Sequence, residues 1–320
     1  MKVFNSIEDQ ITKLKQRGVV INDEEYAKDY LLRNNYYCVI NSCSKPFLLS
    51  NASNYIPGTN FSEIVAVHQF EREIKHVTFK FIIEIEQHLR SIISHIFCQQ
   101  HNQPYDCINI NSYNFSPSNI NDVAGLISQI SKVINKQVNS QTANSIKHYS
   151  NHHGDVPYWV LSGYLTFGSM INVYKLLENS EKRNVISSFE RYLNLNLGTN
   201  NVSIKNEDFL IMLNSLLDLR NVVAHNSKLF GFKCRTSISY TAELHDKFNI
   251  GSTAPKQDYY NMIVLQNCFL TSVQFAQLYN ALIKRCKNLN SRLSTIDVNT
   301  VTSSLGLPTD FHLYTKIPQQ

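Results

Sequence analysis

Two short stretches of the chain each place an arginine five residues before a histidine. In LDLRNVVAHN the pair is Arg220 and His225, with Asn221 directly after the arginine, and in LRSIISH the pair is Arg90 and His95. Arginine carries a permanent planar charge that matches phosphate oxygens. Histidine titrates near neutral pH, so its imidazole can remove or donate a proton. These residue types predict cleavage of a phosphodiester, with histidine as acid or base and arginine stabilising the charge of the transition state.

The spacing within each motif makes one copy geometrically incomplete. Five residues rotate an ideal helix by about 140°, so the arginine and the histidine of one motif point in different directions. Asn221 and His225 are four residues apart and share a face, so Asn221 could orient the imidazole. Two motifs that face one another would supply base, acid and phosphate clamp. The predicted reaction is RNA cleavage by attack of the ribose 2′-hydroxyl, leaving a 2′,3′-cyclic phosphate, without metal or cofactor.

A structural role is the alternative for both motifs. Arg90 can pair with Glu86, four residues earlier on the same helix. A histidine among apolar neighbours is more often a hydrogen-bonded core residue than a catalytic one.

Further basic side chains are candidates for RNA contacts, with a solvated surface as the alternative. Three follow the second motif and two lie in KHYSNHHGD, and they are Lys228, Lys233, Arg235, Lys147 and His148. His148 and His152 could also bind a metal, but Asp155 is the only acid nearby, so we predict a basic loop that contacts RNA. Of the aromatic pairs, Tyr158-Trp159 and two others could stack bases or fill the core.

Apolar periodicity predicts the helices that must position these residues. Apolar side chains recur every three to four residues over 61–100, which indicates one long helix or two in tandem. Helices are also predicted over 6–17, 22–33, 122–138, 158–178, 181–194, 206–225 and 258–288. Residues 41–60 and the KHYSNHHG stretch are predicted loops, and residues 236–240 could form a short strand within an irregular 231–257. The fold class is therefore all-α.

Composition narrows the setting of the protein. The 320 residues include few Gly (10) and Pro (8), and the formal charge of +5 permits a nucleic-acid partner without requiring one. The seven cysteines form no CxxC pair. No signal-peptide core opens the chain, and no apolar run is long enough to span a bilayer. We therefore expect a cytoplasmic protein without a membrane partner.

Several blocks resemble the Abi-like family of bacterial abortive-infection proteins, which belongs to the HEPN superfamily. The blocks lie in the same order as in that family, and they are QITKLKQRGVVINDEEYAKDYLLRNNYY, FEREIKHVTFKFIIEIEQHLRSIISH, PYWVLSGYLTFGSMINVYKLL, LRNVVAHNSKLF and GLP at 306–308. The chain departs from the family at Gly163, where an acidic residue is common, and at Asn226, where a second histidine is common.

The resemblance implies a HEPN-like helical bundle and phage defence by RNA cleavage. The chain, 1–320, would then be a single all-α unit that could consist of two packed halves, an N-terminal half, 1–140, with the first motif and a C-terminal half, 141–320, with the second. Family nucleases pair such motifs across a dimer or between two domains, so a second copy of the chain is a candidate partner beside RNA. The alternatives are a non-catalytic module that binds RNA or protein, and a toxin held inactive by a cognate RNA or antitoxin.

Overall fold

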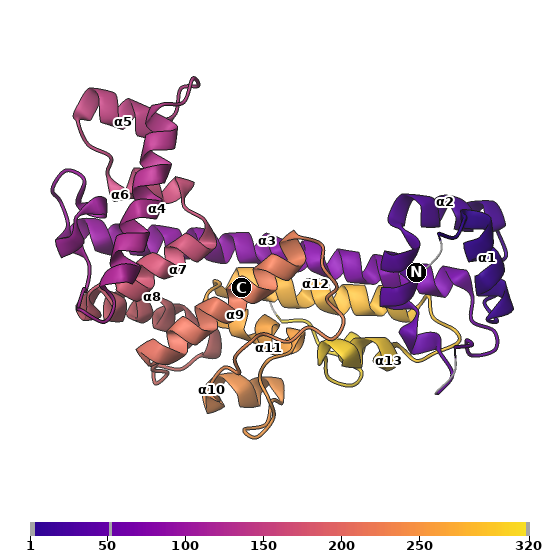
Figure 1. Cartoon of the computed structure of the whole chain (residues 1–320). Coiled ribbons are helices and arrows are strands. Elements are labelled where there is room, and N and C mark those ends of the chain that lie inside the picture. The colour runs from indigo at the N-terminus through magenta and orange to yellow at the C-terminus, as the bar shows by residue number, and fades with distance from the viewer. Residues whose placement is uncertain (1–3, 51–52, 318–320) are drawn as a thin grey trace.

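The protein is an elongated assembly of helices arranged along one long central helix (Figure 1). The computed structural model describes residues 4–50 and 53–317, and these contain helices and isolated bridges but no strand. The predicted all-α class is confirmed. The strand considered at 236–240 does not form: the amides of Cys234 and Ile238 donate to the carbonyls of Gln257 and Lys256, but this pairing does not extend into a ladder.

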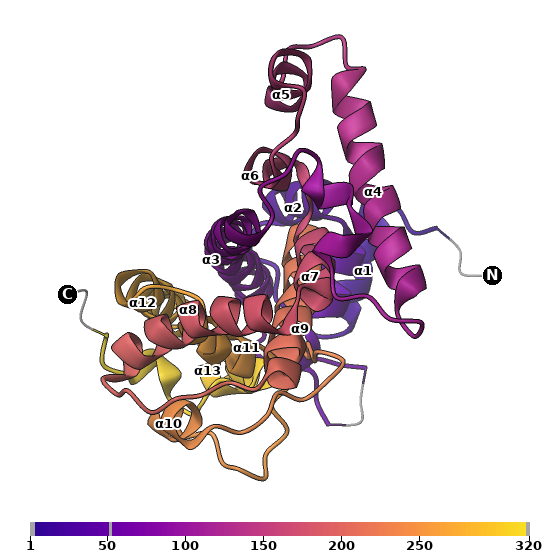
Figure 2. The same cartoon turned by 90° about the vertical axis from the view of Figure 1, so that its left-hand side faces the viewer.

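Helix α3, Phe61–Gln100, is the longest helix of the described residues and the central element of the fold. It is a single helix, and Asn60 and Glu63 form a capping box at its start. Helices α8, Asn179–Leu197, α9, Asn206–Ala224, and α12, Ser272–Asn290, pack along it. Figure 2 views the molecule from the end where α3 terminates. One hydrophobic core cluster includes side chains from both sides of residue 140. The division of the chain into two halves at this point stays a prediction.

The N-terminal helices lie at the beginning of α3 (Figure 1). Helix α1, Ile7–Gln16, is capped by Ser6, and α2, Glu24–Asn34, is capped by Asp23. Glu63, 2% exposed, ties this end to the C-terminal region because it accepts hydrogen bonds from Ser294 and Thr295. The predicted loop at 41–60 includes residues 51 and 52, which lie outside the described residues.

Three helices and a helical turn gather around the other end of α3 (Figure 1). They are α4, Ile120–Val138; α5, Ser145–His153; α6, Tyr158–Leu161; and α7, Phe167–Leu176. The prediction of a loop for KHYSNHHG was wrong: Asn144 caps α5 at its start and Gly154, in the left-handed conformation with φ 66°, ends it. The polar run lacks an apolar stripe, which is why its periodicity gave no helix signal.

Three short helices belong to the C-terminal part of the chain. They are α10, Ala242–His245; α11, Tyr259–Leu265; and α13, Val298–Thr302. Helix α11 packs against α9, and α13 packs against α12. The helix predicted over 258–288 is broken, because Thr271 and Gln274 form a capping box that starts α12 afresh. Short 3-10 segments and one π-helix (η1) fill the connections: η1 Tyr37–Asn41, η2 Lys45–Phe47, η3 Asp106–Ile108, η4 Ile110–Ser112, η5 Ser162–Tyr164, η6 Asp246–Phe248, η7 Gln266–Cys268, η8 Ser303–Leu305 and η9 Phe311–Leu313.

Candidate functional site

The R-N-x3-H motif lies at the C-terminal end of α9, and its arginine has no acidic partner in the part of the chain that the structure describes. Arg220 is partly buried, and one guanidinium nitrogen, Nη1, lies 3.5 Å from the side-chain oxygen of Asn221. Its Nε is buried without a hydrogen-bond partner among the described residues. The nearby Asp218 pairs instead with Arg235, at 3.0 Å. The positive charge of Arg220 is therefore not neutralised within the described chain.

His225 is the residue on which α9 ends. Its amide donates to the carbonyl of Asn221 at 3.1 Å, and its side chain is exposed. The expected orienting bond from the Asn221 side chain to the imidazole is not among the hydrogen bonds of the described residues, and Asn221 accepts from Arg220 instead. The imidazole is accessible to a ligand from solvent.

Two buried charges of α3 hold the segment that follows His225. Glu71 and Lys75 form an ion pair at 3.4 Å, with side chains 4% and 5% exposed. Lys75 also donates to the side chain of Asn226 at 3.1 Å, and a Glu71 oxygen accepts from the amide of Leu229 at 2.6 Å. Asn226 has φ 51°, a left-handed conformation that asparagine tolerates better than most residues. The position of His225 thus depends on this buried pair.

The sequence reasoning missed the role of Glu71 and Lys75. Their four-residue spacing is typical of a solvent-exposed pair, so the spacing alone does not identify Lys75 as buried. The sequence nevertheless contains a signal that Glu71 and Lys75 are buried. Their spacing is continued along one buried face of α3 by Thr78, Ile82 and Ile85. Charged residues at positions that continue a buried stripe indicate a buried pair.

A basic pocket adjoins the same segment. A cavity of about 420 Å³ is lined by Lys228 together with Arg17 and Lys45, and no carboxylate lines it among the described residues. Ser42, Ser44 and Tyr37 add hydroxyl groups to the wall. Arg17 also donates to the carbonyl of Ser53 and lies over the ring of Tyr55. The predicted RNA-binding residue Lys228 therefore has two cationic neighbours that the sequence did not indicate.

The other predicted phosphate contacts lie outside this pocket. Lys233 is exposed, and its backbone makes an isolated bridge with Asp258. Arg235 is exposed but is paired with Asp218. Only Lys228 among the three residues lines the basic pocket.

The arginine of the first motif has an acidic partner, although its Nε, like that of Arg220, is buried without a hydrogen-bond partner among the described residues. Arg90 donates to Glu86 at 2.9 Å, to Gln87 at 3.1 Å and to the carbonyl of Leu165 at 3.3 Å. The ion pair with Glu86, which was the structural alternative for this residue, is present. His95 is exposed, and its Nε2 lies 3.1 Å from the side-chain nitrogen of Gln99. The charge of Arg90 is neutralised, unlike that of Arg220.

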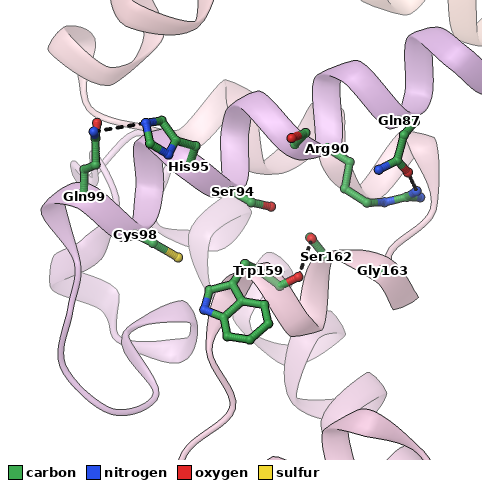
Figure 3. A pocket seen from close by; sticks show the side chains of 10 residues that line it. Gln87, Arg90, Ser94, His95, Cys98, Gln99, Trp159, Ser162 and Gly163 are labelled. Carbon is green, nitrogen blue, oxygen red and sulfur yellow. Dashed lines mark hydrogen bonds between the residues drawn. The ribbon is translucent and has the colours of Figure 1, made fainter.

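Arg90 and His95 nevertheless line the largest cavity described here, of about 750 Å³ (Figure 3). The opposite wall comes from α6 and η5 and carries Trp159, Ser162 and Gly163. The Trp159 side chain is 54% exposed, whereas Tyr158 beside it is buried in the core. Of this pair, only Trp159 is available to a ligand.

The structure does not bring the two motifs together within one chain. Asn226, next to His225, contacts Lys75, whereas His95 lies 20 residues further along α3 (75 to 95). At 1.5 Å per residue this corresponds to about 30 Å along the helix axis. A composite site of Arg90, His95, Arg220 and His225 in a single chain is therefore excluded by geometry.

The basic residues of α5 lie far from the α9 motif and close to the Trp159 pocket. Lys147 donates to the carbonyl of Ser140 at 2.7 Å, and the His148 ring is 4.8 Å from that of His152. In the part of the chain that the structure describes, no group of three or more His, Cys, Asp or Glu side chains is arranged to hold a metal ion. Tyr149, on the same helix, contacts the indole of Trp159 edge-on.

Fold and site define an all-α protein with an exposed histidine and an unneutralised arginine at one helix end. The sequence model of the family described as Abi-like protein matches residues 29–231, more than half of the chain. The chain therefore belongs to the Abi-like family, which indicates a role in abortive infection. No curated protein and no solved structure gave a significant match. Among the described residues, no helix is both long and apolar enough to cross a membrane.

Proposed function

We propose that the protein is a HEPN-type ribonuclease of abortive infection and that the α9 motif is its catalytic centre. One observation carries this choice of motif: among the described residues Arg220 has no carboxylate partner, whereas Arg90 has Glu86, and Arg220 stands five residues before an exposed histidine. A phosphate would supply the missing negative charge. Arg90 already has Glu86 and needs no ligand.

The reaction is an internal transesterification of RNA. A histidine removes the proton from a ribose 2′-hydroxyl, the 2′-oxygen attacks the adjacent phosphorus, and the bond to the 5′-oxygen breaks. The leaving 5′-oxygen takes up a proton, and a 2′,3′-cyclic phosphate remains. Arg220 stabilises the negative charge that builds on the phosphate oxygens. No cofactor enters these steps.

A second copy of the chain is the proposed source of the second proton-transfer group. Base and acid act on opposite sides of the phosphorus, and one His225 does not occupy both places at once. His95 lies about 30 Å away along α3 and does not supply that group within the chain. Two α9 motifs that meet in a homodimer would provide two histidines and two arginines.

The basic pocket beside the motif is proposed to hold the RNA backbone. Arg17, Lys45 and Lys228 converge on one cavity without a lining carboxylate among the described residues. Such a cluster favours phosphate by charge without reading the sequence of the RNA. It therefore supports RNA as the substrate but does not indicate a preferred base.

The test is cleavage of single-stranded RNA in EDTA by the full chain and by Arg220→Ala and His225→Ala. We expect both variants to lose at least a hundredfold in rate and the wild-type products to carry 2′,3′-cyclic phosphate ends. Arg235→Ala is the matched control, since this exposed arginine pairs with Asp218 outside the site. Equal cleavage by all four proteins would refute the assignment.

The remaining outcomes separate the alternatives. RNA binding with no cleavage by any protein would favour a non-catalytic binding module. Cleavage that appears only after a co-purifying RNA or protein is removed would favour a toxin held inactive by that partner. Dependence of the specific rate on protein concentration would support the homodimer, and a rate independent of concentration together with a monomeric mass would exclude it.

A further inference from the structure

We infer that the cavity between α3 and the α6–η5 turn binds an unpaired nucleobase of an RNA strand. The inference rests on the proposed function in one respect, that the ligand belongs to RNA. It assigns Arg90 and His95 to a binding site remote from the catalytic motif. The cavity, of about 750 Å³, lies within the size range of natural ligand sites (Figure 3).

The indole of Trp159 supplies a flat surface for stacking. Trp159, the only tryptophan of the chain, is 54% exposed. Its orientation is held by an edge-on contact with Tyr149, in which the ring centroids are 5.2 Å apart. A large aromatic ring that is exposed yet held in place suits a planar ligand, because little conformational freedom is lost on binding.

Polar groups that lack partners line the same cavity. The Ser94 side chain is only 6% exposed, and its hydroxyl has no hydrogen-bond partner among the described residues. Figure 3 shows this hydroxyl on the face of α3 that is turned toward Ser162 and Trp159. A buried hydroxyl without a partner costs free energy, which a ligand that offers a hydrogen bond would recover. Gln87 and Gln99 provide further donors and acceptors at the wall.

The charge of the cavity favours a base over a phosphate. No carboxylate lines it among the described residues, and the one permanent cation, Arg90, is already paired with Glu86 at 2.9 Å. The cavity is therefore nearly neutral, aromatic on one side and rich in hydrogen-bonding groups. This is the chemistry of a nucleobase, and it contrasts with the Lys228 pocket, which three cations line without a carboxylate among the described residues.

Gly163 makes it possible to narrow the cavity without removing any of its groups. A Cβ atom built on Gly163 meets nothing within 4 Å, and the residue is not in the left-handed region. Gly163→Leu should therefore narrow the cavity opposite α3 while the fold is retained, and Gly163→Ala is the matched control that adds only one methyl group.

The experiment uses Trp159 as its own reporter. The full chain is titrated with single-stranded 2′-O-methyl RNA, which cannot be cleaved by 2′-hydroxyl attack, while indole fluorescence and RNA anisotropy are followed. We expect binding to change the fluorescence of the wild type and Gly163→Ala but not of Gly163→Leu. Trp159→Ala, followed by anisotropy, should weaken binding by about 5- to 150-fold, the range for one stacked base. Because the RNA is not cleavable, the result is independent of the catalytic proposal.

Four results would overturn the inference. One is RNA binding that leaves Trp159 fluorescence unchanged, and another is equal affinity of Gly163→Leu and the wild type. The third is a nucleoside monophosphate that changes the fluorescence as strongly as RNA at the same concentration, which would assign the cavity to a free nucleotide. Failure of both ligands to bind would likewise refute it.

Discussion

The buried pair of Glu71 and Lys75 provides a direct test of how the α9 motif is held. We consider Lys75→Met, which keeps a long side chain and removes the charge. Glu71 then remains 4% exposed without its cation and retains only the amides of Leu229 and Phe230. Loss of one partner from a buried ion pair destabilises proteins by about 3–5 kcal/mol. Because two amides still contact Glu71, we expect about 3 kcal/mol.

The measurement is urea unfolding followed by circular dichroism, with a double-mutant cycle. Glu71→Gln alone should also destabilise the protein, while the double variant should lose less than the sum of the two single losses. An exposed pair on α2 gives the matched control: Arg33 and Asp29 have the same four-residue spacing, with side chains 64% and 56% exposed. Arg33→Met should change stability by no more than about 0.5 kcal/mol.

Two results would refute this reasoning. If Lys75→Met costs no more than Arg33→Met, burial does not strengthen the interaction. If the two single losses simply add, Glu71 and Lys75 do not act as a pair. A cleavage rate that falls in Lys75→Met at a temperature where the protein stays folded would link the pair to the position of His225, whereas an unchanged rate would confine the pair to stability.

Three further predictions follow from the same geometry. Asn226→Gly should be less stable than the wild type because Lys75 loses the side-chain oxygen of Asn226 as an acceptor. Asn226→Ala should be about 1 kcal/mol less stable than Asn226→Gly because alanine disfavours φ 51°. Thermal unfolding of the three proteins measures this order of stability. Burial alone would raise the pKa of Glu63, but hydrogen bonds from Thr295, Ser294 and Asn60 outweigh it and hold the pKa below its usual 4.5. The ionised Glu63 side chain therefore stabilises the protein above pH 4.5, and this stabilisation is lost as the pH falls through the lowered pKa. The melting temperature should consequently decrease less between pH 6 and pH 3 in Glu63→Gln than in the wild type. RNA affinity should increase with length until a strand spans the about 30 Å along α3 that separates Lys75, which contacts the segment after His225, from His95 at the Trp159 cavity; this length corresponds to about nine stacked nucleotides. Affinity that does not depend on RNA length would argue against two contact regions.

The sequence predicted the helices whose boundaries have local signals. Ser6 and Gly18 delimit α1, and the apolar stripe of 61–100 indicated the longest helix. Periodicity does not reveal a break within an apolar stretch, so α11 and α12 were predicted as one helix. The Thr271 and Gln274 capping box was visible in the sequence, but the same pattern occurs inside unbroken helices.

The separation of the two motifs could not be predicted from the sequence. It depends on which turn of α3 meets the end of α9, and that contact is made by Lys75 and Asn226, which are 151 positions apart in the chain. The cation neighbours of Lys228 come from the N-terminal helices for the same reason. Contacts between distant segments follow from packing, which local spacing does not encode.

The difference between the two motifs could, by contrast, be found locally. Four residues before Arg90 stands Glu86, and four residues before Arg220 stands Leu216. On a helix the first arrangement forms an ion pair and the second does not, as the structure shows for Arg90 and Glu86 at 2.9 Å. Asp218, two residues before Arg220, points elsewhere and pairs with Arg235. An arginine that is neutralised by its own helix has little charge left to offer a phosphate. The residue four positions before each arginine therefore indicates which motif is available for catalysis, even though the two motifs have the same spacing.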